Sequence, residues 1–386
     1  MTSVRALVSP QRRYMLCGRA DAAGSGGSLP CVITTVRSTL GEGCSMRFGL
    51  MYDFRNPRRW YIEPPRFYRA MLDQMVAAED LGFDNVWLTE HHFTDDAYNP
   101  ASLSMAAAVA AVTQRIRIGT FVLLLPFLHP VRAAEDVTLA DILSNGRFDL
   151  GVGQGYTHEE FNAFCVDRRE RAPRLVEGIE LMRRLFTEQN VTFEGRFTEV
   201  RDMTLSPRPV QQPHPPLWVG ARGPKAIRRA AELGAHLMTT LGPDPAPLYL
   251  ETLRELGRDP AAFRIAQLRM VYCAESEDQA WDDVAEHLFH VFGYYERVLG
   301  EAADVDGDDQ PLPFRTPGEI RGSAFADAAL MIGTPDQVGE KLSRFRDEFA
   351  CTDFILSSHF AGLDPARSGR SNELFARHVM PAFRDA

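Results

Sequence analysis

The chain has 386 residues, of which 45% are hydrophobic and 24% charged, and its formal net charge at pH 7 is -10. This composition is ordinary for a globular protein and allows one large domain or two smaller ones. The acidic balance and the lack of a long basic run argue against nucleic acid or an anionic membrane as a partner. The longest apolar stretch, IGTFVLLLPFLHP, is too short to span a bilayer and is broken by Pro126 and Pro130.

Residues 1–45 differ in character from the rest of the chain. They contain the low-complexity stretch DAAGSGGSLP and no apolar run before a small-residue cleavage site, so we expect no signal peptide. We predict a disordered N-terminal extension, with a regulatory arm as the alternative, and a folded domain over residues 46–386. The six cysteines include no C-x-x-C pair, which fits free thiols in a reducing cytoplasm.

From Met46 onward, short apolar segments alternate with segments of helical periodicity. The apolar segments predict eight strands, in the order MRFGLM, NVWLTE, IRIGTFVLLL, RFDLGVG, PLWVG, AHLMTT, FRIAQLRMVYC and DFILSS. The periodic segments predict helices over residues 65–81, 99–114, 129–146, 168–187, 224–233, 246–256, 278–298, 334–349 and 371–383. The stretch VTFEGRFTEV predicts a small hairpin that turns at Glu194-Gly195.

Eight strands separated by helices predict an α/β fold, a closed (β/α)8 TIM barrel with an insertion before the last strand. An open doubly wound sheet is the alternative, but the glycine-rich GVGQGY lacks the third glycine of a dinucleotide-binding turn. Residues 299–333 are acidic and then rich in proline and glycine. A connection this long in a compact domain indicates a lid over the active site or a disordered segment.

Chemistry in such a barrel sits where the strands end. At the end of the second predicted strand stand Glu90, His91 and His92, for which metal binding, catalysis and a surface position are the three alternatives. Consecutive strand residues point to opposite faces, so the two rings should not bind one metal ion, and we expect no metal. Histidine titrates near neutral pH and suits proton transfer. Glu90 could fix the tautomer of His91 or bond to another strand.

The sequence resembles the bacterial luciferase-like flavin-dependent monooxygenases. The matching stretches are GFDNVWLTEHHF, HPVRAAEDVTLADILSNGRFDLGVG, PPLWVGARGPKAIRRAAELGAHLMT and IGTPDQV. They occur in the same order and spacing as in the luciferase α-subunit, and the resemblance runs from Met46 to the C-terminus. Residues 1–45 have no counterpart there.

The resemblance implies that reduced flavin (FMNH2) reacts with O2 at C4a and that the peroxide oxygenates a small apolar organic substrate. It also implies a separate flavin reductase and a homodimer that meets through the helices of SMAAAVAAV and HPVRAAEDVTLADILSNG. The first histidine of the E-H-H motif, His91, would act in proton transfer beside the flavin. Apolar pocket walls are expected from Phe54, Trp87 and Leu125.

The cofactor contacts implied by the resemblance include two departures from the luciferase pattern. Gln154 stands where luciferase has an arginine that binds phosphate, and Gly220-Ala221 replaces Glu-Ser. The resemblance also implies a cis peptide at Phe121–Val122 against the flavin ring. The remaining cofactor-binding candidates are Glu90, the start of the predicted helix at Gly220, Ala221, Arg222 and Gly223, and Arg171 or Arg174 reaching from the preceding helix.

Two rival functions stay open at this point. The first is hydride transfer with the deazaflavin F420 on the same fold, which the missing phosphate arginine favours. The second is a non-catalytic flavin-binding subunit, which the retained histidine argues against.

Overall fold

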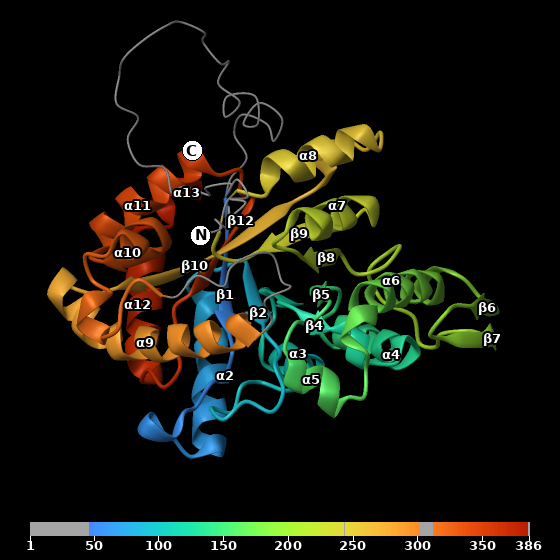
Figure 1. The fold of residues 1–386 in the computed structure, drawn as a ribbon, viewed down its shortest axis with the longest axis horizontal. Helices are drawn as coiled ribbons and strands as arrows, with labels where there is room; N and C mark the ends of the chain where they lie inside the picture. Colours follow the sequence, from blue (N-terminus) through green and yellow to red (C-terminus); the bar gives the residue numbers. More distant parts are fainter. Residues whose placement is uncertain (1–45, 243, 302–311, 385–386) are drawn as a thin grey trace, which may run out of the picture.

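The computed structural model describes residues 46–242, 244–301 and 312–384. The extension predicted over residues 1–45 lies outside the described residues, as do residues 302–311 of the predicted lid segment. Figure 1 shows a central sheet enclosed by helices, with a small hairpin projecting at the right-hand edge.

Eight parallel strands close into a barrel in the order β1-β2-β3-β5-β8-β9-β10-β12, with β12 pairing back to β1. Their bounds are β1 (Arg47–Tyr52), β2 (Asn85–Leu88), β3 (Arg117–Thr120), β5 (Phe148–Gly153), β8 (Leu217–Gly220), β9 (His236–Thr239), β10 (Ile265–Cys273) and β12 (Asp353–Ser357). Leu50 of β1 stands in register with Val86 on one side and Leu356 on the other. The predicted (β/α)8 barrel is therefore confirmed, with all eight strands in the predicted segments.

The helices cover the outside of the barrel and bury its apolar outer face. The long ones are α2 (Pro64–Asp80), α3 (Ser102–Val112), α4 (Pro130–Leu143), α6 (Arg171–Thr187), α7 (Pro224–Glu232), α8 (Ala246–Glu255), α9 (Glu277–Glu301), α11 (Pro335–Glu348) and α12 (Pro365–His378). The short ones are α5 (His158–Ala163), α10 (Ala324–Ala329) and α13 (Pro381–Arg384). The last predicted helix, over 371–383, was placed too late, because Asp364 caps α12 and Pro381 starts a separate turn.

The structure departs from a plain eight-stranded barrel in three places. The third predicted strand is divided by the cis peptide Phe121–Val122, after which β4 (Leu123–Leu124) pairs with β5. The predicted hairpin is present as β6 (Val191–Glu194) and β7 (Glu199–Met203). A strand that the sequence did not predict, β11 (Leu330–Gly333), pairs with the second half of β10 and shares a second apolar core with α9 and α10.

The barrel interior is filled by large side chains that need glycine opposite them. Trp87 and Trp218 meet edge to face at 5.6 Å between ring centroids. A Cβ atom on Gly119 would lie 2.1 Å from the Trp87 ring, and one on Gly49 would lie 2.7 Å from it. Any larger residue at these two positions would therefore displace the indole from the interior.

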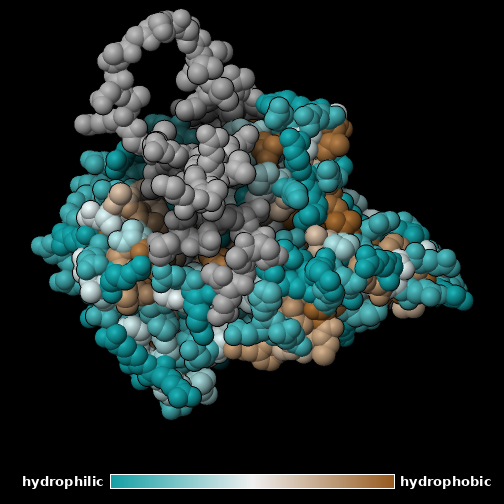
Figure 2. All heavy atoms as spheres, in the orientation of Figure 1, coloured by the Kyte–Doolittle hydropathy of each residue, from teal (hydrophilic) through white to brown (hydrophobic). Residues whose placement is uncertain are grey.

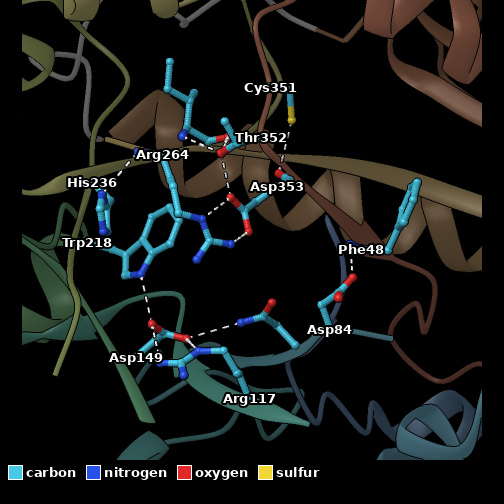
Figure 3. A network of polar contacts seen from close by, with 12 residues as sticks. Phe48, Asp84, Arg117, Asp149, Trp218, His236, Arg264, Cys351, Thr352 and Asp353 are labelled. Atoms are coloured by element: carbon cyan, nitrogen blue, oxygen red, sulfur yellow. Dashed lines mark hydrogen bonds and ion pairs between the residues drawn. The ribbon is translucent and has the colours of Figure 1, made fainter. Parts of the chain in front are cut away.

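A buried polar network closes the N-terminal end of the barrel (Figure 3). Asp149 is fully buried and receives two hydrogen bonds from Arg117, at 2.7 and 3.0 Å, and one from Trp218 at 3.4 Å. Asp353 pairs with Arg264, whose guanidinium lies over the Trp218 ring. At this end of a barrel such groups serve stability and not chemistry.

We predict that Arg117→Met lowers the free energy of unfolding by about 3 kcal/mol, because it leaves the Asp149 carboxylate buried without its cationic partner. The matched control is Arg115→Met, two residues earlier, whose side chain is 67% exposed and pairs with Asp80. The decrease in the free energy of unfolding of this control should stay below about 1 kcal/mol. Urea denaturation of both variants measures the difference, and equal losses would contradict the structural role given to the network.

Candidate active site

His91 lies just beyond the C-terminal end of β2, with its ring held from both sides. Nδ1 lies 2.9 Å from Glu160 Oε1, and Nε2 lies 3.1 Å from the hydroxyl of Tyr156. Tyr98 and Tyr156 meet the imidazole edge to face. Tyr156 and Glu160 come from the loop and short helix α5 that follow β5, so two strand ends build this one group.

The partners of His91 assign its proton. A carboxylate only accepts hydrogen bonds, so Nδ1 of His91 carries the hydrogen, and Nε2 of the neutral ring accepts from the Tyr156 hydroxyl. Burial, with the nearby Tyr295 and Tyr294 hydroxyls, raises the pKa of Tyr156 well above its ordinary value. The phenol therefore keeps its proton at neutral pH and presents it to the imidazole.

Glu160 holds three groups at once. Burial would raise its pKa, but the hydrogen bonds from His91, Thr157 and the backbone N–H of His92 hold the pKa of Glu160 below its ordinary value. The carboxylate is thus ionised at neutral pH and only 1% exposed. It fixes the orientation of the His91 ring and the backbone of the loop after β2.

Glu90 could fix the tautomer of His91 or bond to another strand. In the structure its carboxylate bonds to other elements and not to His91. Its Oε2 accepts from the backbone N–H and hydroxyl of Ser102 at the start of α3, and Oε1 accepts from Leu124 N–H in β4. His92 Nε2 lies 3.6 Å from the same carboxylate, while its ring packs against Phe164 and Phe127. Glu90 therefore ties the loop after β2 to its neighbours.

An arginine contacts Gln154, the residue that stands where luciferase has its phosphate-binding arginine. Gln154, directly after β5, accepts a hydrogen bond from Nη1 of Arg229 at 3.1 Å. Partial burial lowers the pKa of Arg229, with Glu232 opposing the decrease and Arg171 adding to it. Arg222 lies close enough to Tyr156 to influence its titration. Arg229 of α7 therefore stands at Gln154.

The loop before α7 is only partly available to a ligand. The N–H of Ala221 donates to Met238 O at 2.9 Å, so this predicted contact is used within the fold. The N–H groups of Gly223 and Lys225 stand at the start of α7, where a helix leaves donors without intrahelical partners. Arg174, the other candidate from α6, pairs with Glu170 and stacks on Phe197.

The cis peptide predicted at Phe121–Val122 is present. Val122 lies over two glycines of the neighbouring strands, since a Cβ on Gly153 or Gly220 would approach its methyl groups to 2.3 or 2.9 Å. Phe121 is 9% exposed and packs with the barrel interior. Phe121, Val122, Gly153 and Gly220 therefore form one continuous wall at the ends of β3, β5 and β8.

The three residues predicted to line a pocket are buried in packing contacts. Trp87 fills the barrel interior on Gly49 and Gly119. Phe54 is fully buried against Tyr68 of α2, and Leu125 packs toward Gly178 of α6. Both are part of the contact between the barrel and its helices.

A second buried polar group stands beside Tyr98. Arg55, after β1, donates from Nε to Asp96 Oδ2 at 2.6 Å and from its backbone N–H to Asp53 Oδ1 at 3.1 Å. His290 of α9 lies 3.2 Å from the same Asp96 oxygen. Burial raises the pKa of Asp53 to about 6, although Arg55 opposes the shift. This group joins the ends of β1 and β2 to α9.

Among residues 46–242, 244–301 and 312–384, no three His, Cys, Asp or Glu side chains are arranged to hold a metal ion. Within the same residues, none of the helices is long and apolar enough to cross a membrane.

Five residues of these groups were not anticipated from the sequence: Tyr156, Glu160, Arg229, Arg55 and Asp96. Tyr156 lies in the loop directly after β5, at a strand end, where chemistry is expected in such a barrel. Glu160 and Arg229 lie on helices, where a charged residue usually indicates a solvated face. Their roles arise from contacts across loops and helices far apart in the sequence.

Comparison with known proteins gives a matching family model and relatives that depend on flavin or on F420. The family model described as luciferase-like monooxygenase matches residues 46–350. A flavin-dependent trigonelline monooxygenase, oxygenase component, from Acinetobacter baylyi is 28% identical over 83% of this chain and 91% of its own length. An F420-dependent glucose-6-phosphate dehydrogenase from Nakamurella multipartita is 36% identical over 72% of this chain and 83% of its own.

Among solved structures, the monooxygenase RslO1 from Streptomyces bottropensis is similar with a TM-score of 0.76 and 28% identity. The match covers 87% of this chain and 99% of that one.

The titration of Asp53 generates a pH prediction. The unfolded carboxyl loses its proton near 3.8, whereas the folded one keeps it to about pH 6. Ionisation therefore penalises the folded state, and the free energy of unfolding should fall by about 1.4 kcal/mol between pH 5 and pH 7. Asp53→Asn should remove this decrease, because an amide does not ionise. Denaturant titrations across this range compare the two proteins; parallel curves would contradict the burial of an ionisable Asp53.

Proposed function

The chain belongs to the luciferase-like monooxygenase family, and we propose that it is a reduced-flavin-dependent monooxygenase that places one oxygen atom of O2 on a small organic substrate. The observation that carries the proposal is the buried His91, with Glu160 on Nδ1 and Tyr156 on Nε2 at the active-site end of β2. Bound reduced flavin would supply the activation of O2.

The residues around His91 supply proton transfer. Nε2 of His91 can take a proton from a bound group and return it, while Glu160 stabilises the positive ring formed when the imidazole is doubly protonated. The site is also shielded, since His91 is 7% and Glu160 1% exposed. Exclusion of water favours transfer of oxygen to substrate over release of hydrogen peroxide.

The residues near Gln154 fit a flavin phosphate. Arg229 with Arg171, Arg222 and the N–H groups of Gly223 and Lys225 would hold it, replacing the cationic group that glutamine does not provide. The wall of Phe121, Val122, Gly153 and Gly220 offers an apolar surface for the flavin ring system. Glu90 supports this wall through Leu124 and does not need to touch the cofactor.

We also propose a separate reductase as the source of reduced flavin, which is supported by the relative named as an oxygenase component. A homodimer through α3 and α4 is supported by exposed apolar residues there: Val112, Leu139 and Leu143 are 38%, 47% and 53% exposed. The face shown in Figure 2 is mainly hydrophilic, with apolar areas below its centre, at the upper right and at the left. The cytoplasm is the proposed location.

The alternative is hydride transfer with F420. It is favoured by the F420-dependent relative at 36% identity and by Gln154. Titration of the flavin-free protein with FMNH2 and with reduced F420 separates the two functions, because the physiological cofactor should bind in the micromolar range or better.

His91→Ala should lower oxygenated product per reduced flavin by about 100-fold and raise hydrogen peroxide correspondingly, because the general acid–base group is lost. The assay supplies FMNH2, ¹⁸O₂ and a panel of small aldehydes, ketones and aromatic compounds, and counts ¹⁸O in the products. His92→Ala is the control and should retain coupling within about tenfold. Undiminished coupling in His91→Ala, with the fold intact by circular dichroism, would remove the catalytic role.

Arg229→Gln should weaken FMN binding by about tenfold and leave riboflavin binding unchanged, because only FMN carries the phosphate. Arg228→Gln is the matched control, since the adjacent Arg228 is 45% exposed and pairs with Glu255. Fluorescence titration measures both ligands. A parallel loss of FMN and riboflavin would show that Arg229 acts on the fold of the loop and not on the phosphate.

A further inference from the structure

The Arg55 guanidinium is buried with four of its five N–H donors unused. Its side chain is 0% exposed, and Nε donates to Asp96. Nη1 and Nη2 have no hydrogen-bond partner within the described part of the chain. Unpaired donors on a buried cation are costly, so such a pair indicates a ligand that accepts from both atoms.

The surroundings of Arg55 are aromatic. Its Cζ atom lies 4.6 Å from the ring centroid of Tyr294, 5.6 Å from that of Tyr98 and 5.9 Å from that of Tyr295. Tyr98 also meets the His91 ring, at 4.9 Å between centroids. Tyr98 therefore contacts both the Arg55 guanidinium and the His91 ring, at the same end of the barrel.

Two carboxyl groups face the Arg55 residue: Asp96, which pairs with the guanidinium, and Asp53, which accepts from the Arg55 backbone N–H. Asp96 pairs with Arg55, and its Oδ2 also lies 3.2 Å from Nε2 of His290. Burial raises the pKa of Asp53 to about 6, so a further anion beside Arg55 meets the least repulsion below that pH. The remaining titratable groups facing Arg55 are the hydroxyls of Tyr98, Tyr294 and Tyr295, whose pKa values are raised mainly by burial. At neutral pH these three are uncharged.

We propose that Arg55 determines substrate specificity by binding a carboxylate of the substrate through Nη1 and Nη2, between the aromatic rings of Tyr98 and Tyr294. The inference rests on the proposed function, because it places the substrate beside His91. A carboxylate is planar and matches the two parallel donors of a guanidinium. The aromatic walls suit a planar, apolar body attached to it.

The test compares carboxylates with their uncharged amides: benzoate with benzamide, and hexanoate with hexanamide. Isothermal titration of the full chain, with and without saturating FMN, measures each affinity. Wild type should bind at least one carboxylate about tenfold or more tightly than its amide, and Arg55→Gln should lose this preference. Arg59→Gln is the matched control, because Arg59 is 65% exposed and pairs with Glu286.

Asp96→Asn provides a variant that keeps Arg55. Removing the charge of Asp96 leaves the guanidinium less neutralised, so carboxylate affinity should rise by about tenfold while amide affinity stays the same. A purely structural Arg55–Asp96 pair predicts no gain. This variant also covers the case in which Arg55→Gln fails to fold.

Three results would overturn the proposal: no carboxylate preference in wild type up to about 10 mM ligand, an unchanged preference in a folded Arg55→Gln, or no gain in a folded Asp96→Asn. Loss of FMN affinity in Arg55→Gln without any carboxylate preference would assign the two Nη atoms to the flavin instead. Binding is measured without turnover, so the result is independent of whether the oxygenation assay succeeds.

Discussion

The packing of two indole rings inside the barrel is the constraint on which the other features depend. Trp87 and Trp218 occupy the interior only because Gly49 and Gly119 leave space for the Trp87 ring. Below them the Asp149 network seals the N-terminal end. With the interior and this end filled, the opposite rim and its loops are where a ligand can enter, as in other barrels of this class.

At that rim, carboxylates hold the loops in place. Glu90 joins the loop after β2 to α3 and β4, Glu160 joins it to α5, and Asp96 joins it to Arg55 and His290. Each carboxylate is buried and shared by two or more donors. The loop after β2 thus has little freedom of its own, and the orientation of His91 follows from the packing of its neighbours. A site fixed in this way is preorganised for chemistry on a loop that would otherwise be mobile.

The sequence was sufficient for the barrel and for its central histidine. Eight apolar segments at regular spacing required eight strands, and the E-H-H motif stood where the second strand ends. Short-range patterns gave no signal for β11, whose four residues follow an alanine-rich turn of helix. Nor could they pair Gln154 with Arg229, because that contact depends on how α7 packs over β8 and β9. Phe54 and Leu125 stay predictions for the pocket wall, and the structure shows Phe54 packed on Tyr68 of α2 and Leu125 facing Gly178 of α6.

Val122 has a consequence for how this protein could change. Its side chain occupies the space above Gly153 and Gly220, so the sizes of these three residues are coupled. A larger residue at either glycine should be tolerated only after Val122 has become smaller, and a smaller residue at 122 would open room that neither glycine fills. Evolutionary paths, or libraries that aim to reshape this wall, would have to vary the three positions together, since single substitutions sample mostly clashes or voids.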